Sequence, residues 1–259
     1  MVLIDSHTHL FHAKFGDDPA RTPGQLVDDA VAAGVGEVIN IACRREEWPS
    51  ALALAETDPR VWVGAGVHPH DAAENPTEAE LLALAAHPRV VALGETGLDY
   101  HYDTAPRAVQ RTVFERHMAA AQQAGLPVII HTREAEADTL DVLKLFPTIP
   151  FVLHCFTSSA AMAEAAVEMG GYISFSGVLT FKKSEELRLI ASRLPRERVL
   201  VETDAPYLAP EPNRGRRCSP AMVAHTAACL AKVWGISDTE TAQITAANTR
   251  RLFGRMNTA

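Results

Sequence analysis

Histidine is the residue whose placement first suggests chemistry in this sequence. The 259-residue chain has 11 histidines, and six of them stand at the ends of short apolar segments; they are His7, His9, His68, His70, His131 and His154. Histidines without a shared role should scatter over helices and loops as well. Neutral imidazole is the commonest protein ligand for metal ions near neutral pH, so the clustering predicts a metal site.

Two carboxylates extend this set. His7 and His9 are two residues apart, so on an extended segment both side chains point to the same face and can bind one ion. Glu95 and Asp204 follow two other apolar runs. The predicted ligands are His7, His9, Glu95, His131, His154 and Asp204. These exceed what one tetrahedral ion needs, whereas two divalent cations sharing a carboxylate would use them all.

Such a centre is suited to an anionic substrate. Two divalent ions and two carboxylates leave a charge of about +2, which attracts an anionic ester and stabilises charge that grows on its oxygens. The same charge does not favour a neutral apolar substrate.

The remaining histidines and nearby polar residues have weaker interpretations. His68 and His70 flank Pro69, so substrate contact and loop stabilisation are equally compatible with them. Cys155 neighbours His154, and strand alternation predicts that it points to the opposite face and only packs. Glu202 is expected in a barrel layer or behind the ligands. The histidines expected on helices or loops, without an assigned role, are His12, His87, His101, His117 and His225.

The elements that must position these residues follow from hydrophobic patterning. Strands are predicted at Val2–Asp5, Glu37–Ala42, Val61–Val67, Val90–Gly94, Pro127–His131, Phe151–His154, Tyr172–Phe175 and Val199–Glu202. Helical spacing lies between them, as at Gly24–Ala33, Thr77–Ala86, Arg107–Ala124 and Ala160–Met169, and two further helices are predicted at Ala221–Trp234 and Thr239–Leu252, the second capped by Ser237. Eight βα units in about 250 residues predict an α/β fold, a single-domain (β/α)8 TIM barrel with extra C-terminal helices.

The barrel interpretation explains where the polar residues fall. In a (β/α)8 barrel the chemistry collects at the carboxyl ends of the strands, where the six candidate ligands stand. An open doubly wound sheet is the alternative, but no GxGxxG motif follows the first strand, so its nucleotide-binding version loses support.

Composition excludes other classes. Apolar residues make up 47% of the chain and the net charge is −8, which provides for a large core and disfavours a wide nucleic-acid groove. The start, MVLIDSHTHLFH, lacks the pattern of a secretory signal, and no apolar run is long enough to span a membrane. The four scattered cysteines are typical of reduced thiols. We therefore expect a cytoplasmic protein.

The ordered motifs resemble those of one family. They are DSHTHL at 5–10, GVHPH at 66–70, GETGLDY at 94–100, HTR at 131–133, HCF at 154–156, SFSGVLTFK at 174–182, ETDAPYLAP at 202–210 and NTRRLF at 248–253. In this series the chain resembles the TatD family of metal-dependent deoxyribonucleases, within the amidohydrolase-like superfamily.

The resemblance implies a role for each candidate ligand. His7, His9 and Asp204 would hold one metal ion, and His131 and His154 a second, with Glu95 bridging the two. Asp204 would also orient the attacking water or accept its proton, so Glu95 and Asp204 are the expected catalytic residues. The expected cofactors are two divalent cations, with Zn, Mn, Co and Mg all compatible with the ligands.

The resemblance also implies a substrate, namely DNA ends or short oligonucleotides attacked in the manner of a 3′–5′ exonuclease. Predicted substrate contacts are His68, Arg133, Lys182, Tyr207 and Arg214; Arg216 and Arg217 are further basic candidates, and Phe156 joins Tyr207 as a residue that can stack on a base. No membrane and no stable protein partner are implied. An enzyme that grips only a strand end makes few phosphate contacts, which is compatible with the acidic chain.

Two points stay open at the level of sequence. Cys218 and Ser219 replace the family's usual Asn and Glu, which leaves the order of the loop after the eighth strand open. The alternative function is a metal-dependent hydrolase of another ester or amide, such as a lactone, phosphotriester or cyclic amide, because a fold alone does not fix a substrate.

Overall fold

Eight parallel strands form the centre of the molecule. The computed structural model describes residues 3–17 and 19–257. Its strands are β1 (Leu3–Thr8), β2 (Val35–Ala42), β3 (Val61–Ala65), β4 (Val90–Asp99), β5 (Val128–Arg133), β6 (Phe151–Leu153), β7 (Tyr172–Phe175) and β8 (Val199–Val201). Each strand pairs in parallel with the next along the chain. Val2, where the first predicted strand begins, lies outside the described residues.

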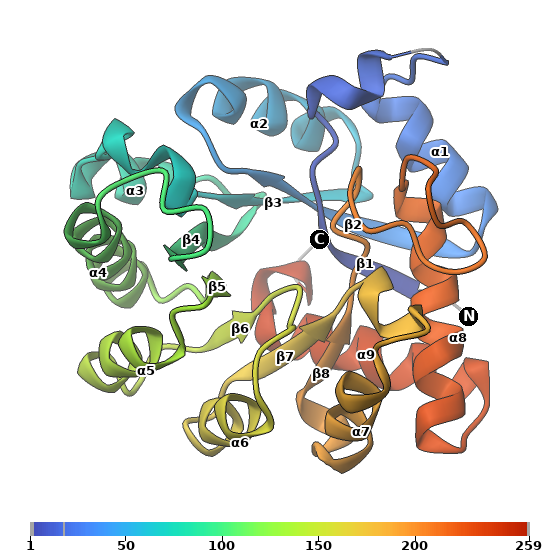
Figure 1. The fold of residues 1–259 in the computed structure, drawn as a ribbon. Helices are drawn as coiled ribbons and strands as arrows, with labels where there is room; N and C mark the ends of the chain where they lie inside the picture. Colours follow the sequence, from blue (N-terminus) through green and yellow to red (C-terminus); the bar gives the residue numbers. More distant parts are fainter. Residues whose placement is uncertain (1–2, 18, 258–259) are drawn as a thin grey trace.

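Helices surround this sheet on its outer side (Figure 1). They are α1 (Pro23–Ala32), α2 (Trp48–Thr57), α3 (Glu78–Ala85), α4 (Arg107–Ala124), α5 (Glu136–Leu145), α6 (Ala160–Glu168), α7 (Glu185–Arg193), α8 (Val223–Trp234) and α9 (Asp238–Leu252). The Ser237 hydroxyl accepts a hydrogen bond from the Glu240 N–H and caps α9, as predicted. The predicted (β/α)8 barrel is confirmed. No helix among the residues described has both the length and the apolar character needed to cross a membrane.

The last strand meets the first at a seam that lies beside the predicted ligands. The N–H of Asp204 donates to the carbonyl of His7 at 2.9 Å, and the N–H of His9 donates to that of Ala205 at 2.8 Å. Below them the buried Asp5 carboxylate accepts hydrogen bonds from the N–H and the hydroxyl of Thr203. The seam therefore holds His7, His9 and Asp204 together through the backbone.

Three strands extend further towards the carboxyl end than predicted. β4 continues to Asp99 and β5 to Arg133, because residues 96–99 pair with residues 130–133. β1 continues to Thr8. Apart from Leu98, the added residues are polar or glycine, so the apolar run that predicted each strand ends before the strand does. The extensions of β4 and β1 carry Glu95 and His7.

The barrel interior is apolar at its amino-terminal end. Ile4, Ile39, Trp62 and Ile129 pack there with Phe253, which follows α9. The segment that follows α9 thus helps to close the amino-terminal end of the barrel. The polar candidate ligands lie at the opposite, carboxyl end.

His117 of α4 is buried behind the end of β3, and this placement gives a stability prediction. Its Nδ1–H donates to the Val113 carbonyl at 2.8 Å, and Nε2 accepts from the Val67 N–H at 3.1 Å, so the ring is neutral. Burial lowers the pKa of His117 to about 4. The stabilisation is therefore complete above pH 6.5, the unfolded value, and is lost as the pH falls towards 4.

The test compares the wild type with His117→Gln, whose amide can make both hydrogen bonds at any pH. Between pH 7.5 and 5 we expect the wild type to lose about 2 kcal/mol more unfolding free energy than the variant, measured by urea denaturation. The exposed His225 on α8 provides the control substitution, His225→Gln, which should follow the wild type. Parallel losses in wild type and His117→Gln would contradict the assignment.

Candidate metal centre

A cavity of about 800 Å³ opens at the carboxyl end of the barrel. Five of the six predicted ligands line it: His9, Glu95, His131, His154 and Asp204. His7 lies directly beneath them and is buried. The structure thus brings all six residues together from β1, β4, β5 and the segments that follow β1, β6 and β8.

Glu95 occupies the middle of this group. It is only 2% exposed, and its two carboxylate oxygens face different histidines. Oε2 lies 3.4 Å from Nε2 of His7 and 3.7 Å from Nε2 of His9. Oε1 lies 3.1 Å from Nδ1 of His131 and 2.8 Å from Nε2 of His154. One carboxylate therefore joins two separate sets of nitrogen donors.

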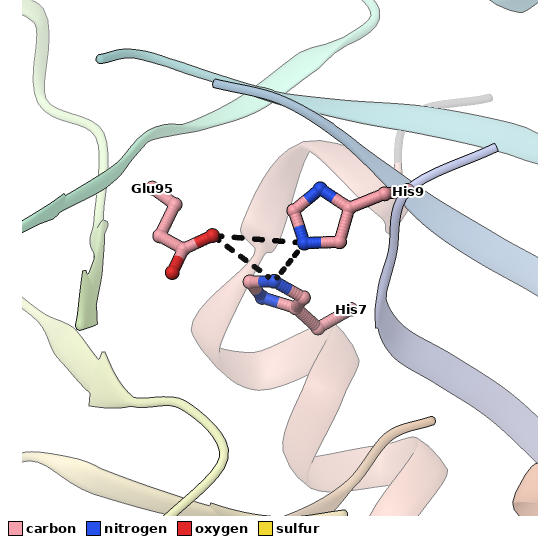
Figure 2. Close-up of side chains that lie close together, drawn as sticks. All are labelled: His7, His9 and Glu95. Carbon is pink, nitrogen blue, oxygen red and sulfur yellow. Dashed lines mark hydrogen bonds and ion pairs between the residues drawn. The ribbon is translucent and has the colours of Figure 1, made fainter. Parts of the chain in front are cut away.

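The first donor set has the spacing of a tetrahedral ion's ligands. Nε2 of His7 and Nε2 of His9 are 3.2 Å apart, and both face Glu95 (Figure 2). Oδ1 of Asp204 completes the set, 3.7 Å from His7 and 3.4 Å from His9. Donors that bind one tetrahedral Zn²⁺ at 2.0–2.2 Å are about 3.4 Å from one another. These four side chains therefore fit a divalent cation.

The second donor set is formed by His131 and His154 with Glu95. Nδ1 of His131 and Nε2 of His154 lie 3.3 Å apart. Their other ring nitrogens meet buried carboxylates: Nε2 of His131 lies 3.1 Å from Asp99, and Nδ1 of His154 lies 3.3 Å from Glu202. Such carboxylates accept a hydrogen bond from the ring N–H and so leave the inward nitrogen free as a ligand. This set also fits a metal ion.

The electrostatics of the site agree with a place for cations. Burial opposes the charge on Glu95, but His154, His68 and His131 outweigh it and hold the pKa of that carboxyl well below its usual range. Burial likewise lowers the pKa of His154, but Glu95 and Glu202 raise it well above the usual value. Glu95 is therefore ionised, and His154 attracts a proton to the lone pairs for which a metal ion competes, so both are positions that a cation would take.

His68 contacts Glu95 from a third side, which the sequence did not indicate. Its Nε2 lies 3.3 Å from Oε1 of Glu95, and its Nδ1 accepts the N–H of His70 at 3.1 Å. Burial lowers the pKa of His68 to about 4, so the neutral ring carries its proton on Nε2 and donates it to Glu95. His68 is therefore placed to orient the carboxylate, while its Nδ1 caps the turn that follows.

Asp99 is a functional residue that the sequence reasoning missed. The buried carboxylate bonds both His131 and, at 2.9 Å, Nε2 of His70. Asp99 lies four residues after Glu95 on β4, and alternation places both side chains on one face. The polar residue at that spacing was a usable signal. It was hidden because the predicted strand stopped at Gly94.

Two predictions for the segment after β6 were wrong. Cys155 has a φ of 43°, so strand alternation ends before it, and its side chain lines the cavity with Sγ 3.2 Å from the hydroxyl of Ser176. Phe156 is 2% exposed and packs against Phe175 at 6.3 Å between ring centres, so it has no surface for stacking on a base.

The predicted substrate contacts divide into two groups. Arg133 and Tyr207 line the cavity with His68. Lys182 and Arg214 are exposed outside the lining residues, and Arg214 stacks on the ring of Phe181 at 3.6 Å.

The loop after β8 is anchored by Arg217. Its guanidinium donates to the carbonyls of Lys14, Asp17 and Pro19, so it holds the segment after β1. Cys218 is fully buried, and its N–H donates to Pro206. These contacts order the loop with cysteine in place of the family's usual residue, and Arg217 is engaged in the fold.

Comparisons with known proteins agree with this geometry. The family model described as TatD related DNase matches residues 4–254. A Mycobacterium tuberculosis protein named as an uncharacterized metal-dependent hydrolase TatD is 41% identical, over 97% of this chain and 98% of its own length. An Edwardsiella piscicida protein named 3′-5′ ssDNA/RNA exonuclease TatD is 37% identical, over 97% and 99%.

A solved structure extends the likeness to three dimensions. The crystal structure of a TatD homologue from Escherichia coli K12 has a TM-score of 0.88 and 29% identity, covering 97% of this chain and 98% of that one. The family model, the relatives and the fold agree over almost the whole length. The chain belongs to the TatD-related DNase family of metal-dependent hydrolases.

Proposed function

We propose that this protein removes nucleotides from DNA ends as a divalent-metal-dependent 3′–5′ exonuclease. The observation that carries the proposal is the placement of Glu95 between two donor sets at the base of an open cavity. A paired centre of this kind suits the hydrolysis of phosphodiesters, whose oxygens gain charge in the transition state. The Edwardsiella piscicida relative, named as an exonuclease, supports the same reaction.

The proposed cofactors are two divalent cations. One ion would be held by His7, His9 and Asp204, and the other by His131 and His154. Glu95 would be a ligand of both ions. Zn²⁺, Mn²⁺ and Co²⁺ suit this mixed imidazole and carboxylate set, and Mg²⁺ suits its oxygens. When bound, they supply an activated water and positive charge at the phosphoryl oxygens.

Asp204 is the proposed general base. Its side chain is 14% exposed, so it reaches the cavity, whereas Glu95 is enclosed by imidazoles. His9, bonded to Asp204, fixes the carboxylate and together with His7 and His154 holds its pKa below the usual range against the effect of burial. The ionised carboxylate can orient the attacking water and accept its proton.

Residues around the cavity bind the strand end in this proposal. The Arg133 guanidinium binds a phosphate, and the ring of Tyr207, 40% exposed, stacks on the terminal base. His12 holds the Tyr207 hydroxyl at 2.7 Å. Lys182 and Arg214 contact phosphates of a longer strand, and His68 acts through Glu95.

The test of the reaction uses a single-stranded oligonucleotide labelled at one end or the other. With added metal, a 3′ label should leave first as a mononucleotide, and a 5′-labelled strand should shorten in single-nucleotide steps. A lactone, a phosphotriester and a cyclic amide are assayed in parallel. A kcat/KM for any of these that exceeds the value for the oligonucleotide would overturn the proposal.

Metal removal gives a separate prediction. Dialysis against a chelator should abolish the nuclease activity, because the proposed ions supply the activated water and the positive charge at the phosphoryl oxygens. Adding back Zn²⁺, Mn²⁺, Co²⁺ or Mg²⁺ should restore it, with about two ions bound per chain at saturation in metal analysis. Undiminished cleavage by the metal-free protein would contradict the proposed centre.

A further inference from the structure

Exposed aromatic rings are rare on this protein and are found at the cavity. In the part of the chain that the structure describes, five large hydrophobic residues are exposed, and two of them are aromatic: Tyr102 at 57% and Tyr207 at 40%. Both line the cavity that contains Glu95 and Asp204. Burying a large apolar side chain stabilises a protein by about 1.5–3 kcal/mol, and an exposed ring lacks this stabilisation. Two such rings at one site suggest a ligand that covers them.

Tyr102 stands beside a positive charge that the fold does not use. The guanidinium of Arg133 lies 4.8 Å from the centre of the Tyr102 ring. Across residues 3–17 and 19–257, no hydrogen bond or ion pair engages that guanidinium. The Tyr102 ring is also T-shaped to the rings of His70 and His101, with centres 5.2 and 4.9 Å away, and still remains 57% exposed. A guanidinium without a hydrogen-bond or ion-pair partner beside such a ring matches the two parts of a nucleotide, since the ring stacks on a base and the guanidinium binds a phosphate.

Tyr102 and Tyr207 are tied to opposite sides of the metal centre. The N–H of Tyr102 donates to Oδ1 of Asp99 at 2.9 Å, and the other oxygen of Asp99 holds His131. The N–H of Tyr207 donates to the carbonyl of Asp204, also at 2.9 Å. The backbone of one tyrosine is therefore anchored on the His131 side of the centre and that of the other on the Asp204 side.

Tyr207 has a cationic neighbour of its own. Nζ of Lys14 lies 4.5 Å from its ring centre, and η1 (Ala13–Gly16), which carries Lys14, is the segment that Arg217 holds. Each exposed tyrosine is thus paired with a basic residue. A single exposed tyrosine needs no explanation, but the same pairing on two different loops at one cavity points to a shared role.

We infer that Tyr102 and Arg133 form a second nucleobase site, on the other side of the scissile phosphate from the base at Tyr207. This inference rests on the proposed function and deepens it. The terminal base stacks on Tyr207 and the preceding base on Tyr102, so the two bases are held apart while the phosphate between them lies over the donor sets. A strand end must then offer two unpaired nucleotides.

The experiment uses thymidine pentanucleotides with a single abasic residue. One has the tetrahydrofuran abasic analogue at the 3′-terminal position, a second has it at the next position, and a third is unmodified. Release of the first nucleotide is measured as kcat/KM for the wild type, Tyr102→Ala, Tyr102→Phe and Tyr207→Ala. Leu145→Ala, exposed on α5 away from the cavity, is the control.

Loss of one stacked base should cost five- to hundred-fold in kcat/KM. Tyr102→Ala should show this loss on the unmodified strand and none on the strand that is abasic at the second position. Tyr207→Ala should show the reverse dependence, losing its effect on the strand that is abasic at the 3′ end. Tyr102→Phe, which keeps the ring, should retain activity, as should Leu145→Ala.

Two results would overturn the inference alone. Tyr102→Ala with wild-type kcat/KM on the unmodified strand would show that the ring makes no useful contact. An equal loss on all three strands would show that Tyr102 only supports the loop. A wild-type enzyme with bound metal that leaves every oligonucleotide intact would instead overturn the proposed function, and the inference with it.

Discussion

Glu95→Gln is expected to lower kcat/KM on a single-stranded oligonucleotide by about 10³-fold or more. Glutamine has the same shape, but one of its two positions becomes an amide nitrogen, which donates hydrogen bonds and does not bind metal. In this site Oε1 and Oε2 of Glu95 each face a different donor set, so no orientation of the amide can serve both. The measurement is the initial rate together with the metal content of the purified variant.

A matched carboxylate on the outer surface provides the control. Glu56 of α2 is 63% exposed and pairs with His87 at 3.1 Å, so Glu56→Gln should keep wild-type activity and metal content. We expect Glu95→Gln to bind fewer than two ions per chain. A Glu95→Gln protein with two ions and normal turnover would show that the carboxylate does not bridge the sets.

The fold could be predicted from the sequence because apolar runs and helical spacing alternate eight times. The positions of the strands were accurate, but their carboxyl ends were not, as β4 shows. Residues Glu95–Asp99 form five residues of strand with two carboxylates and two further polar or glycine positions. Hydrophobic patterning detects strands by the surfaces they bury against the core, and Glu95 and Asp99 face the cavity instead.

The same reasoning explains which site residues could be predicted. His7, Glu95 and His131 stand on extended strands whose carboxyl ends must meet, so the barrel itself brings them together. Cys155 follows a strand end at positive φ, where the direction of a side chain depends on the local turn. The alternation of side chains in a strand does not continue through a residue with positive φ, and this is why the predicted direction of the Cys155 side chain was wrong.

Contacts between distant loops could not be predicted from the sequence. Arg217 is separated from Lys14 by about 200 residues, and it binds carbonyl groups, which every residue type has. No pattern of side chains marks such a partner. The exposed ring of Tyr102 is a similar case, because the sequence does not show whether a loop tyrosine is buried or open.

Asp204→Asn is expected to lower kcat by 10²- to 10⁴-fold with little change in the fold. Asp204 has a φ of 57°, in the left-handed region, where aspartate and asparagine are the favoured residues after glycine. Asparagine can therefore keep the backbone bonds from Asp204 to His7 and from Tyr207 to Asp204 that order the seam. Its side chain loses the negative charge and can no longer accept a proton from water.

Comparison with Asp204→Ala separates the two roles proposed for this carboxylate. Alanine removes both the orientation of the water and the acceptance of its proton, whereas the asparagine carbonyl can still orient it. We expect Asp204→Asn to be the more active of the two by about tenfold, the value of one hydrogen bond of about 1–1.5 kcal/mol. Equal activities would assign the whole effect to the charge.

The test also needs the metal content of Asp204→Asn and a control substitution at a surface aspartate. His131, His154 and Glu95 are unchanged in Asp204→Asn, so at least the ion they hold should remain, as measured by metal analysis. Asp141, exposed on α5 and bonded by Lys144 at 3.0 Å, provides the control Asp141→Asn, which should keep full activity. A wild-type kcat for Asp204→Asn would rule out Asp204 as the base, since an amide cannot take the proton.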